Sequence, residues 1–199
     1  VNIIRSPLCG RNFEYMSEDP YLNSVLAVQY IQGLQSRDVA CSVKHFALNN
    51  QETNRTTVEV ECSERALREI YLPAFKAAVQ EGGALTVMAA YNKYLGDWCA
   101  ENKYLARDIL RDEWGFKGVY VTDWGAAHST VKSAIAGLDL EMGTNIENYD
   151  DWYFANPLIE AVKKGEIPES LVDEKVRNVL RVMTVSYTHL RAHETSAHL

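Results

Sequence analysis

The chain has 199 residues, of which 47% are hydrophobic and 24% charged, so it is long enough for one globular domain with a sizeable core. Its net charge of −7 at pH 7 and its pI near 5.3 argue against binding to nucleic acids or to membranes, since both select basic surfaces. No run of 18 or more apolar residues occurs, so the sequence offers no bilayer-spanning segment.

The start of the chain and its cysteines indicate its context. The first residues, Val-Asn-Ile-Ile-Arg, are neither an initiator methionine nor a signal peptide, and we expect the chain to be the middle of a longer polypeptide. The four cysteines are widely spaced and form no C-x-x-C pair, which argues against structural zinc and a disulfide framework. This pattern favours a reducing, cytoplasmic location over a secreted one.

The first half of the chain predicts two strands and two helices. Strands are expected at residues 2–4 and 40–46. Apolar spacing predicts a helix over residues 21–35, with one face carrying Leu22, Leu26, Tyr30 and Leu34. Ser63 is a favourable N-cap for a helix that runs to about residue 80, and Pro73 is expected to kink it. The buried side of this helix is predicted to contain Leu67, Ile70, Tyr71, Ala74 and Ala78.

The second half continues the same alternation. Strands are expected at residues 85–90, 119–122 and 137–141. Helices are expected at residues 102–113, 126–136, 154–164 and 169–183. Strands that alternate with helices are typical of βαβ units, so the sequence predicts an α/β fold with a parallel sheet.

The last sixteen residues differ from the rest. Residues 184–199 hold three of the five histidines and show no helical apolar stripe, so we expect domain 1–183 to be followed by a non-native or disordered tail. The tail is similar to translated adapter or vector sequence. The alternative is metal binding by His189, His193 and His198, but no acidic or thiol partner supports a defined site. We therefore predict no metal.

One stretch organises the chain chemically. The apolar residues 119–122 have strand composition and lead directly into Asp123, Trp124 and Gly125. In an α/β barrel the carboxyl end of a strand is where catalytic residues lie, which favours a catalytic Asp123. The alternative is that Asp123 only caps the next helix, and composition alone does not decide between them.

The segments around Asp123 form an ordered pattern. The sequence reads Ile-Leu-Arg-Asp-Glu at 109–113, Trp-Gly-Phe-Lys at 114–117, then Gly118 and a strand that ends in Thr122 and Asp123. This pattern resembles the active-site signature of glycoside hydrolase family 3. The resemblance implies that Asp123 is the catalytic nucleophile. It also implies a (β/α)8 TIM-type barrel followed by a second α/β domain, so that the five strands predicted here form an incomplete barrel of about the last five βα units.

Two further motifs match the sugar-binding loops of that family. Arg11 lies in a Gly-Arg-Asn-Phe-Glu stretch, and Lys44 and His45 end an apolar strand. The resemblance implies that all three bind sugar hydroxyls. The guanidinium suits this role because its fork of donors can hold two neighbouring hydroxyls. The alternatives are a surface salt bridge of Arg11 with Glu14 and Glu18, and a core histidine beside a lysine that reaches solvent.

A third approach to the sugar follows the strand at 85–90. The resemblance implies that Met88 lines the pocket and that the Tyr91 hydroxyl lies beside the nucleophile as a donor; otherwise both would be core residues. Trp124 offers an apolar face for a sugar ring, and Trp98 is a weaker candidate for the same role. Glu52 is expected to pair with Arg55 or hold its loop, and Asp139 and Glu141 are assigned structural roles.

These matches imply a fragment of a retaining β-glycosidase that hydrolyses terminal β-D-glucosyl or xylosyl residues of an oligosaccharide or glycoside through an aspartyl-glycosyl intermediate, without a cofactor. The acid/base of the family is a Glu in the second domain, so we expect the chain alone to be inactive. Two alternatives stay open. One is a phosphate-handling barrel, for which Gly125 or Gly143 alone is poor support. The other is a non-catalytic carbohydrate-binding or scaffold fragment.

Overall fold

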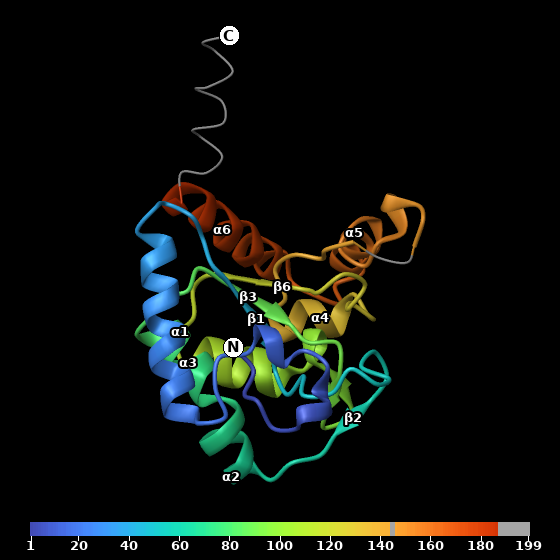
Figure 1. Cartoon of the computed structure of the whole chain (residues 1–199). Coiled ribbons are helices and arrows are strands. Elements are labelled where there is room, and N and C mark those ends of the chain that lie inside the picture. The colour runs from blue at the N-terminus through green and yellow to red at the C-terminus, as the bar shows by residue number, and fades with distance from the viewer. Residues whose placement is uncertain (144–145, 187–199) are drawn as a thin grey trace.

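Three parallel strands form the main sheet of the computed structural model, which describes residues 1–143 and 146–186 (Figure 1). They are β1 (Ser42–Phe46), β3 (Thr86–Ala89) and β6 (Val119–Val121), in the spatial order β1-β3-β6. Leu140 adds one parallel bridge to Val121. Each crossover between these parallel strands contains helices, so the α/β class predicted from the sequence is confirmed.

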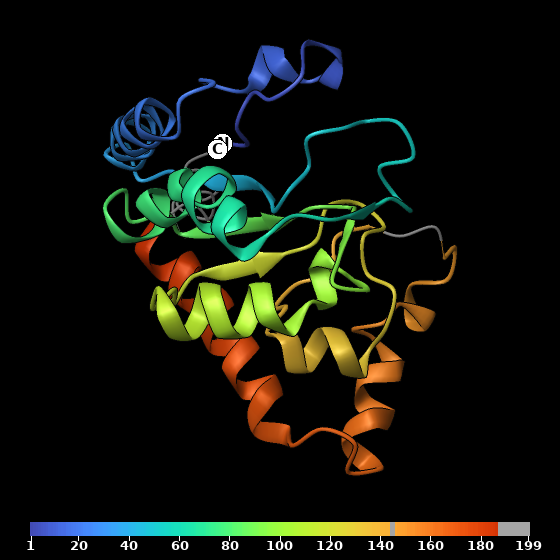
Figure 2. The ribbon, with the colours of Figure 1, turned by 90° about the horizontal axis from the view of Figure 1, so that it is seen from below.

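Helices cover the strands on two sides. Figure 2 shows α1 (Pro20–Gln35) and α3 (Pro73–Gln80), which pack against each other, on one side of the strands. On the other side lie η5 (Tyr104–Glu113), α4 (Val131–Ala136), α5 (Asn156–Lys163) and α6 (Glu169–Ser186). The remaining helical segments are short: η1 (Pro7–Cys9), η2 (Asn12–Glu14), α2 (Glu64–Ala66), η3 (Leu67–Tyr71), η4 (Cys99–Glu101) and η6 (Tyr149–Asp151).

The helical run from residue 64 to residue 80 begins and breaks where the sequence predicts. The Ser63 side chain accepts a hydrogen bond from the backbone N–H of Ala66 at 3.2 Å, as an N-cap does. Pro73 has no N–H to donate. In the turn before it the hydrogen bonds span five residues instead of four, and the Leu72 N–H donates to the Leu67 carbonyl at 2.9 Å. Pro73 then opens α3.

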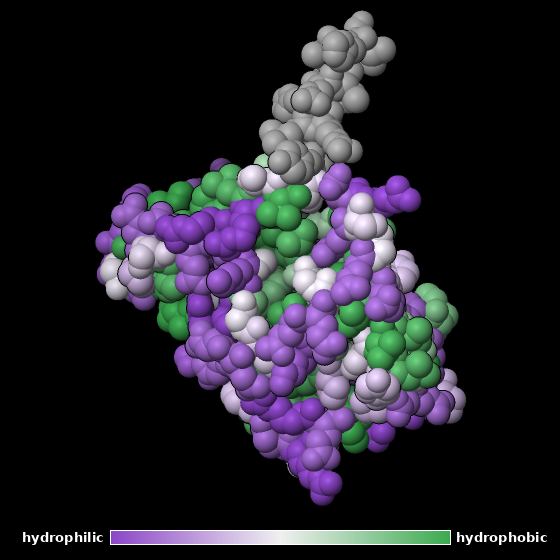
Figure 3. Space-filling model, turned by 90° about the vertical axis from the view of Figure 1, so that its left-hand side faces the viewer, coloured by the Kyte–Doolittle hydropathy of each residue, from purple (hydrophilic) through white to green (hydrophobic). Residues whose placement is uncertain are grey.

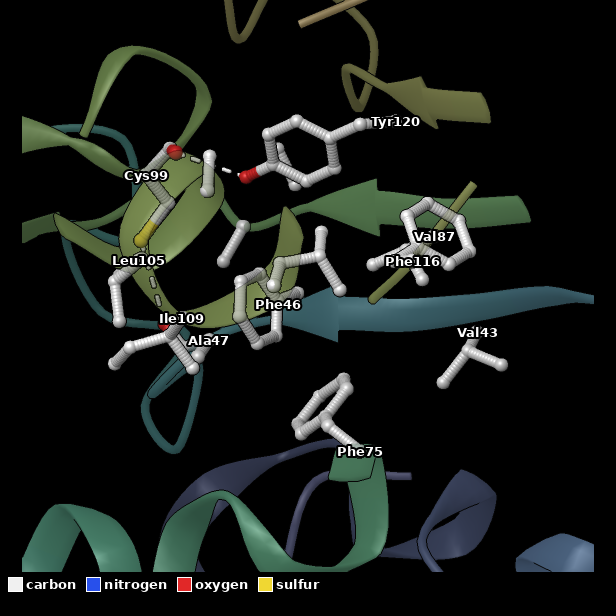
Figure 4. Packing of buried hydrophobic residues seen from close by; sticks show 14 of the residues in the cluster. Val43, Phe46, Ala47, Phe75, Val87, Cys99, Leu105, Ile109, Phe116 and Tyr120 are labelled. Atoms are coloured by element: carbon white, nitrogen blue, oxygen red, sulfur yellow. Dashed lines mark hydrogen bonds between the residues drawn. The ribbon is translucent and has the colours of Figure 1, made fainter. Parts of the chain in front are cut away.

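Aromatic side chains from three layers meet in the core (Figure 4). The Phe46 ring lies edge-on to Phe75 and Tyr120, with ring centroids 5.2 and 6.2 Å away. It also lies edge-on to Trp114, at 5.9 Å between centroids. The buried Tyr120 hydroxyl donates to the carbonyl of Cys99 at 2.8 Å, which satisfies its polar end. The ends of β1 and β6 are therefore anchored to the same packed cluster.

A second, small sheet lies beyond the main strands. Strand β2 (Glu59–Val60) pairs in parallel with β4 (Lys93–Tyr94), which pairs antiparallel with β5 (Asp97–Trp98). These strands come from the loops that follow β1 and β3. The sequence predicts no strand in either segment, because two-residue strands carry almost no periodicity.

The predicted face of α1 is wrong. The helix buries Asn23, Ala27, Val28 and Ile31, whereas the side of Leu22, Leu26, Tyr30 and Leu34 is exposed. The helix is apolar on both sides, so its periodicity could not select the buried one. Figure 3, drawn from the side of the molecule that carries α1, shows hydrophobic surface scattered among hydrophilic surface.

Three other boundaries also differ from prediction. Residues 2–4 form no strand. The side chain of Asn2, rather than its backbone, pairs with β1: it donates to the His45 carbonyl at 2.9 Å and accepts from the His45 N–H at 2.8 Å. The strand predicted at 137–141 is reduced to the single bridge of Leu140. The helix predicted at 126–136 begins only at Val131.

The domain boundary predicted at residue 183 falls inside a helix. Helix α6 continues through Ser186, and residues 187–199 lie outside the described part of the chain. Among the described residues, no helix combines the length and the apolar character needed to cross a membrane.

Candidate active site

The carboxyl edge of the main sheet gathers the predicted site residues from three strands. His45 is the second-last residue of β1, Tyr91 follows β3 by two residues, and Asp123 follows β6 by two. Because β1, β3 and β6 are parallel neighbours, their carboxyl ends meet at one edge. This edge is where open α/β sheets and barrels place their ligands.

His45 faces the carboxylate of Asp123. The distance from His45 Nε2 to Asp123 Oδ2 is 3.4 Å, and both side chains are largely shielded from solvent. Burial, and then the positive charges of Arg11 and Lys44, lower the pKa of His45 to about 3. The imidazole is therefore neutral at physiological pH, and the contact is one of a neutral ring with a carboxylate. The other carboxylate oxygen, Oδ1, accepts from the Trp124 N–H at 2.8 Å.

Tyr91 lies at the same place, close to two acceptors. Its hydroxyl donates to the backbone carbonyl of Trp124 at 2.7 Å, and it also interacts with the Asp123 carboxylate. Burial, and then the negative charge of Asp123, raise the pKa of Tyr91, so the phenol stays protonated. The Arg55 guanidinium lies over the ring, 4.7 Å from its centroid. Tyr91 is thus fixed as a neutral donor next to the acid.

Arg11 and Lys44 are held by acidic side chains. Arg11 Nε donates to Glu14 Oε1, and Lys44 Nζ lies 3.4 Å from Glu14 Oε2. Arg11 Nη1 also lies 3.7 Å from Glu52 Oε1. The predicted alternative for Arg11, a salt bridge with acids of its own loop, is therefore present for Glu14.

Glu52 also pairs with Arg55, as predicted. Its Oε2 accepts from Arg55 Nη1 at 2.8 Å. The same carboxyl group thereby links the Arg11 side of the site to the arginine that covers Tyr91.

The two tryptophans have different surroundings. Trp124 is 59% exposed and packs its edge close to Gly143, where an added Cβ would lie 2.4 Å from Trp124 Cδ1. Trp98 is covered on its ring: His128 stacks on it at 3.9 Å between centroids, and Lys93 Nζ lies 4.0 Å from its centroid. Of the two, Trp124 has the exposed surface that could receive a sugar ring. Met88 is half-buried on β3, opposite Val121 in the ladder.

A buried ion pair supports the strand that leads to Asp123. Arg111 donates to the Asp139 carboxylate and to the carbonyls of Gly118 at 2.7 Å and Gly137 at 3.1 Å. The same carboxylate accepts from the Tyr120 N–H at 2.7 Å. Burial raises the pKa of Asp139 although the Arg111 charge opposes this shift. The structural role predicted for Asp139 fits these contacts. The sequence pattern around Arg111 does not indicate that this residue pairs with Asp139 in the core.

Glu141, also assigned a structural role, holds a neighbouring turn. Its Oε2 accepts from the Phe154 N–H at 2.8 Å. A cavity of about 350 Å³ lies beside it, lined by Trp152, Phe154, Leu158 and Lys175 among others, and none of the seven predicted site residues lines it. Its walls come from α5, α6, the loop before α5 and the segment around the Leu140 bridge. The close approach of His45 to Asp123 favours the strand edge as the site.

No metal-ligand cluster of three or more His, Cys, Asp or Glu side chains occurs within residues 1–143 and 146–186. The histidines considered as metal ligands, His189, His193 and His198, lie outside the described residues. The four cysteines are free thiols, three of them buried.

Comparison with known proteins identifies the family. Residues 1–182 match the model described as the Glycosyl hydrolase family 3 N terminal domain. The chain is 52% identical over 191 residues to Beta-glucosidase BoGH3A of Bacteroides ovatus, an alignment that covers 92% of this chain and 26% of that protein. It is 44% identical over 180 residues to the Exo-alpha-(1->6)-L-arabinopyranosidase of Bifidobacterium breve, covering 90% of this chain and 23% of that protein.

A solved structure agrees with these sequence matches. Beta-glucosidase 3B from Thermotoga neapolitana, in complex with alpha-D-glucose, superimposes with a TM-score of 0.87 at 45% identity, and covers 93% of this chain and 26% of that one. The chain thus spans about a quarter of the length of the relatives it matches. With a family model that covers almost its whole length, the chain belongs to glycosyl hydrolase family 3, through the N-terminal domain of that family.

Proposed function

We propose that this chain supplies the nucleophile and the sugar-binding side of the active site of a retaining β-glycosidase, which hydrolyses terminal β-D-glucosyl or β-D-xylosyl residues. The observation that carries the proposal is the Asp123 carboxylate, which lies at the carboxyl edge of the parallel sheet, 3.4 Å from a neutral, buried His45. Residues 1–183 would form part of a (β/α)8 barrel domain, comprising about five βα units.

Cleavage of a glycosidic bond with retention needs two carboxyl groups about 5–5.5 Å apart. Asp123 would attack the anomeric carbon, forming a glycosyl ester as the bond to the departing oxygen breaks, while a carboxylic acid protonates that oxygen. A water molecule, which gives its proton to the same acid/base, then attacks the anomeric carbon and releases the sugar and free Asp123. The acid/base would be a Glu outside this chain.

The neighbouring groups suit the charge that develops during this reaction. Arg11 and Lys44 are cationic side chains that can hold sugar hydroxyls, and neutral His45 offers an Nε2–H donor without adding charge. The half-exposed Trp124 would provide an apolar surface for the ring, with Met88 as part of the wall. Tyr91, protonated and held against the Trp124 carbonyl, would orient the loop that bears the nucleophile.

The nucleophile is testable in the complete enzyme. Asp123→Asn should abolish hydrolysis of an aryl β-glucoside, and mass spectrometry should find no adduct with a fluorinated glycoside that labels the wild-type enzyme. Near-normal turnover in this variant would remove Asp123 from the mechanism. Since relatives include a glucosidase and an arabinopyranosidase, a panel of aryl glycosides is needed to define the preferred sugar.

The chain alone is expected to be inactive, because the acid/base would be missing. Robust hydrolysis of an aryl β-glucoside by the isolated 199-residue polypeptide would contradict this. The rival function is a non-catalytic carbohydrate-binding or scaffold fragment. Calorimetry that detects glucose binding by the complete protein, with no hydrolysis, would favour the rival.

A further inference from the structure

Glu14 connects two cations that come from different parts of the chain. Its Oε1 accepts from Arg11 Nε, and its Oε2 lies 3.4 Å from Lys44 Nζ. Arg11 lies in the loop before η2, and Lys44 is on β1. Each carboxylate oxygen therefore has its own cation, and one side chain fixes the relative positions of both.

The three charges are partly withdrawn from water, so they interact more strongly than surface pairs. The side chains of Arg11, Glu14 and Lys44 are 16%, 22% and 41% exposed. Burial by itself would raise the pKa of Glu14, but the hydrogen bond and charge of Arg11, together with Lys44, lower it. Glu14 is consequently ionised over the whole neutral range and keeps both contacts.

The backbone that carries Glu14 is anchored independently of the ion pairs. Glu14 ends the η2 turn, in which its N–H donates to the Arg11 carbonyl at 3.1 Å. The next residue, Tyr15, is buried and donates its hydroxyl to the carbonyl of Asn49 at 2.8 Å. This bond ties the turn to the loop after β1, so Glu14 is a fixed point to which Arg11 and Lys44 are attached.

We infer that Glu14 is a positioning residue, which holds Arg11 and Lys44 at the separation needed for both to reach hydroxyls of one sugar ring. The inference rests on the proposed function, since it assigns Glu14 a role through the two groups that bind sugar there. Glu52 cannot substitute for Glu14, because it lies farther from Arg11, at 3.7 Å, and its other oxygen is bonded to Arg55. Misplacing such groups by about 1 Å can cost on the order of 100-fold in rate.

The test uses the complete enzyme with the variants Glu14→Gln and Glu14→Ala. The matched control is Glu69→Gln, which breaks an exposed pair with Arg65 on the helical run of α2 and η3. We expect Glu14→Gln to lower kcat/KM on an aryl β-glucoside by roughly 10- to 100-fold, through both a higher KM and a lower kcat. The control variant should match the wild type. The thermal unfolding midpoint of Glu14→Gln should stay close to that of the wild type.

A double-mutant cycle separates positioning from a merely structural role. If Glu14 acts through Lys44, the loss in Glu14→Ala/Lys44→Ala should be clearly smaller than the product of the two single losses. Wild-type kinetics in Glu14→Gln, multiplicative losses in the cycle, or a fall in activity explained by a matching fall in thermal stability would each overturn the inference.

Failure of the proposed function gives a different result. In that case the wild-type enzyme itself does not hydrolyse the glycoside, and the inference is judged by glucose binding in calorimetry. Binding that weakens at least several-fold in Glu14→Gln, but not in Glu69→Gln, supports positioning without catalysis. Equal binding by wild type and Glu14→Gln, or no glucose binding by the wild type, overturns it.

Discussion

Arg111 and Asp139 form an ion pair inside the core, with the guanidinium donating to the carboxylate and to the carbonyls of Gly118 and Gly137. These two carbonyls lie just before β6 and just before the Leu140 bridge. The pair therefore links the two segments that lead to the carboxyl edge of the sheet, where Asp123 lies. The segment 109–123 thus contains a residue of a structural ion pair, Arg111, as well as the proposed nucleophile, Asp123.

Asp139→Asn should destabilise the fold strongly. It leaves the Arg111 charge buried without its acid, and breaking such a pair costs about 3–5 kcal/mol. Urea unfolding at pH 7 measures the difference. The control is Asp108→Asn, which removes the exposed partner of Lys103 and should cost less than about 1 kcal/mol. Equal losses of unfolding free energy for the two variants would show that the buried pair contributes no more to stability than the exposed one.

The neutral His45 should make stability depend on pH. The unfolded chain protonates this histidine below its usual pKa of 6.5, whereas the folded protein resists protonation down to about pH 3. The unfolded state thus binds more protons between these values, so stability is lost as the pH falls, by up to about 1.4 kcal/mol per pH unit from this group. The contribution is fully present above pH 6.5.

His45→Gln isolates this effect, because all other groups titrate in both proteins. The free energy of unfolding, measured in urea from pH 7 to pH 4.5, should fall less steeply for the variant than for the wild type. Parallel curves over that interval would mean that His45 takes up a proton as readily in the folded protein as in the unfolded chain, which would contradict the lowered pKa.

Gly143→Ala should displace Trp124. The added Cβ would lie 2.4 Å from Cδ1 and 3.0 Å from Nε1 of the indole, and the backbone has a φ of +49° that costs a non-glycine residue about 1–2 kcal/mol. Gly165→Ala is the matched control, with a φ of +73° but open space around the new methyl. Both variants should lose stability from strain. Only Gly143→Ala should also shift the indole N–H signal of Trp124 in an NMR spectrum, and an unmoved signal would contradict the close packing.

Gly118→Ala should disrupt the start of β6. Its Cβ would lie 2.1 Å from the Leu85 carbonyl oxygen, the acceptor for the Val119 N–H, so the β3 and β6 backbones must separate. We expect a loss of about 3 kcal/mol or more in urea unfolding. Gly33→Ala, in a spacious position of α1, should instead stabilise the protein by about 0.5–1 kcal/mol. A mild effect of Gly118→Ala would indicate that the two strands are not so closely packed.

The orientation of α1 is checked by two truncations. Ile31 is 3% exposed and Leu26 is 42% exposed, so Ile31→Ala should cost about 2–5 kcal/mol and Leu26→Ala less than about 1 kcal/mol. Both losses are measured by urea unfolding. A larger loss of stability for Leu26→Ala than for Ile31→Ala would mean that the face carrying Leu26 is the buried one.

The strand edge could be predicted from sequence because polar residues interrupt or end apolar runs there. His45 and Asp123 both violate the local apolar pattern, and such violations point to function. Their closeness then follows from the parallel sheet. By contrast, α1 is apolar on two sides, and only its contact with α3 decides which side is buried.

Contacts between distant segments that do not follow from the parallel sheet could not be predicted from a single sequence. Glu14 and Lys44 are thirty residues apart, and nothing local signals that one carboxylate serves both Arg11 and Lys44. Likewise, the coverage of Trp98 by His128 and Lys93 depends on how the small second sheet folds back. Side chains that meet only through tertiary structure produce no periodic pattern in the sequence.

The exchange of two hydrogen bonds between the Asn2 side chain and the His45 backbone has a practical consequence. The amide side chain makes the two hydrogen bonds that a neighbouring strand would make at this residue of β1. Replacing Asn2 by alanine would therefore leave the N–H and the carbonyl of His45 without these partners, at the residue whose side chain faces Asp123.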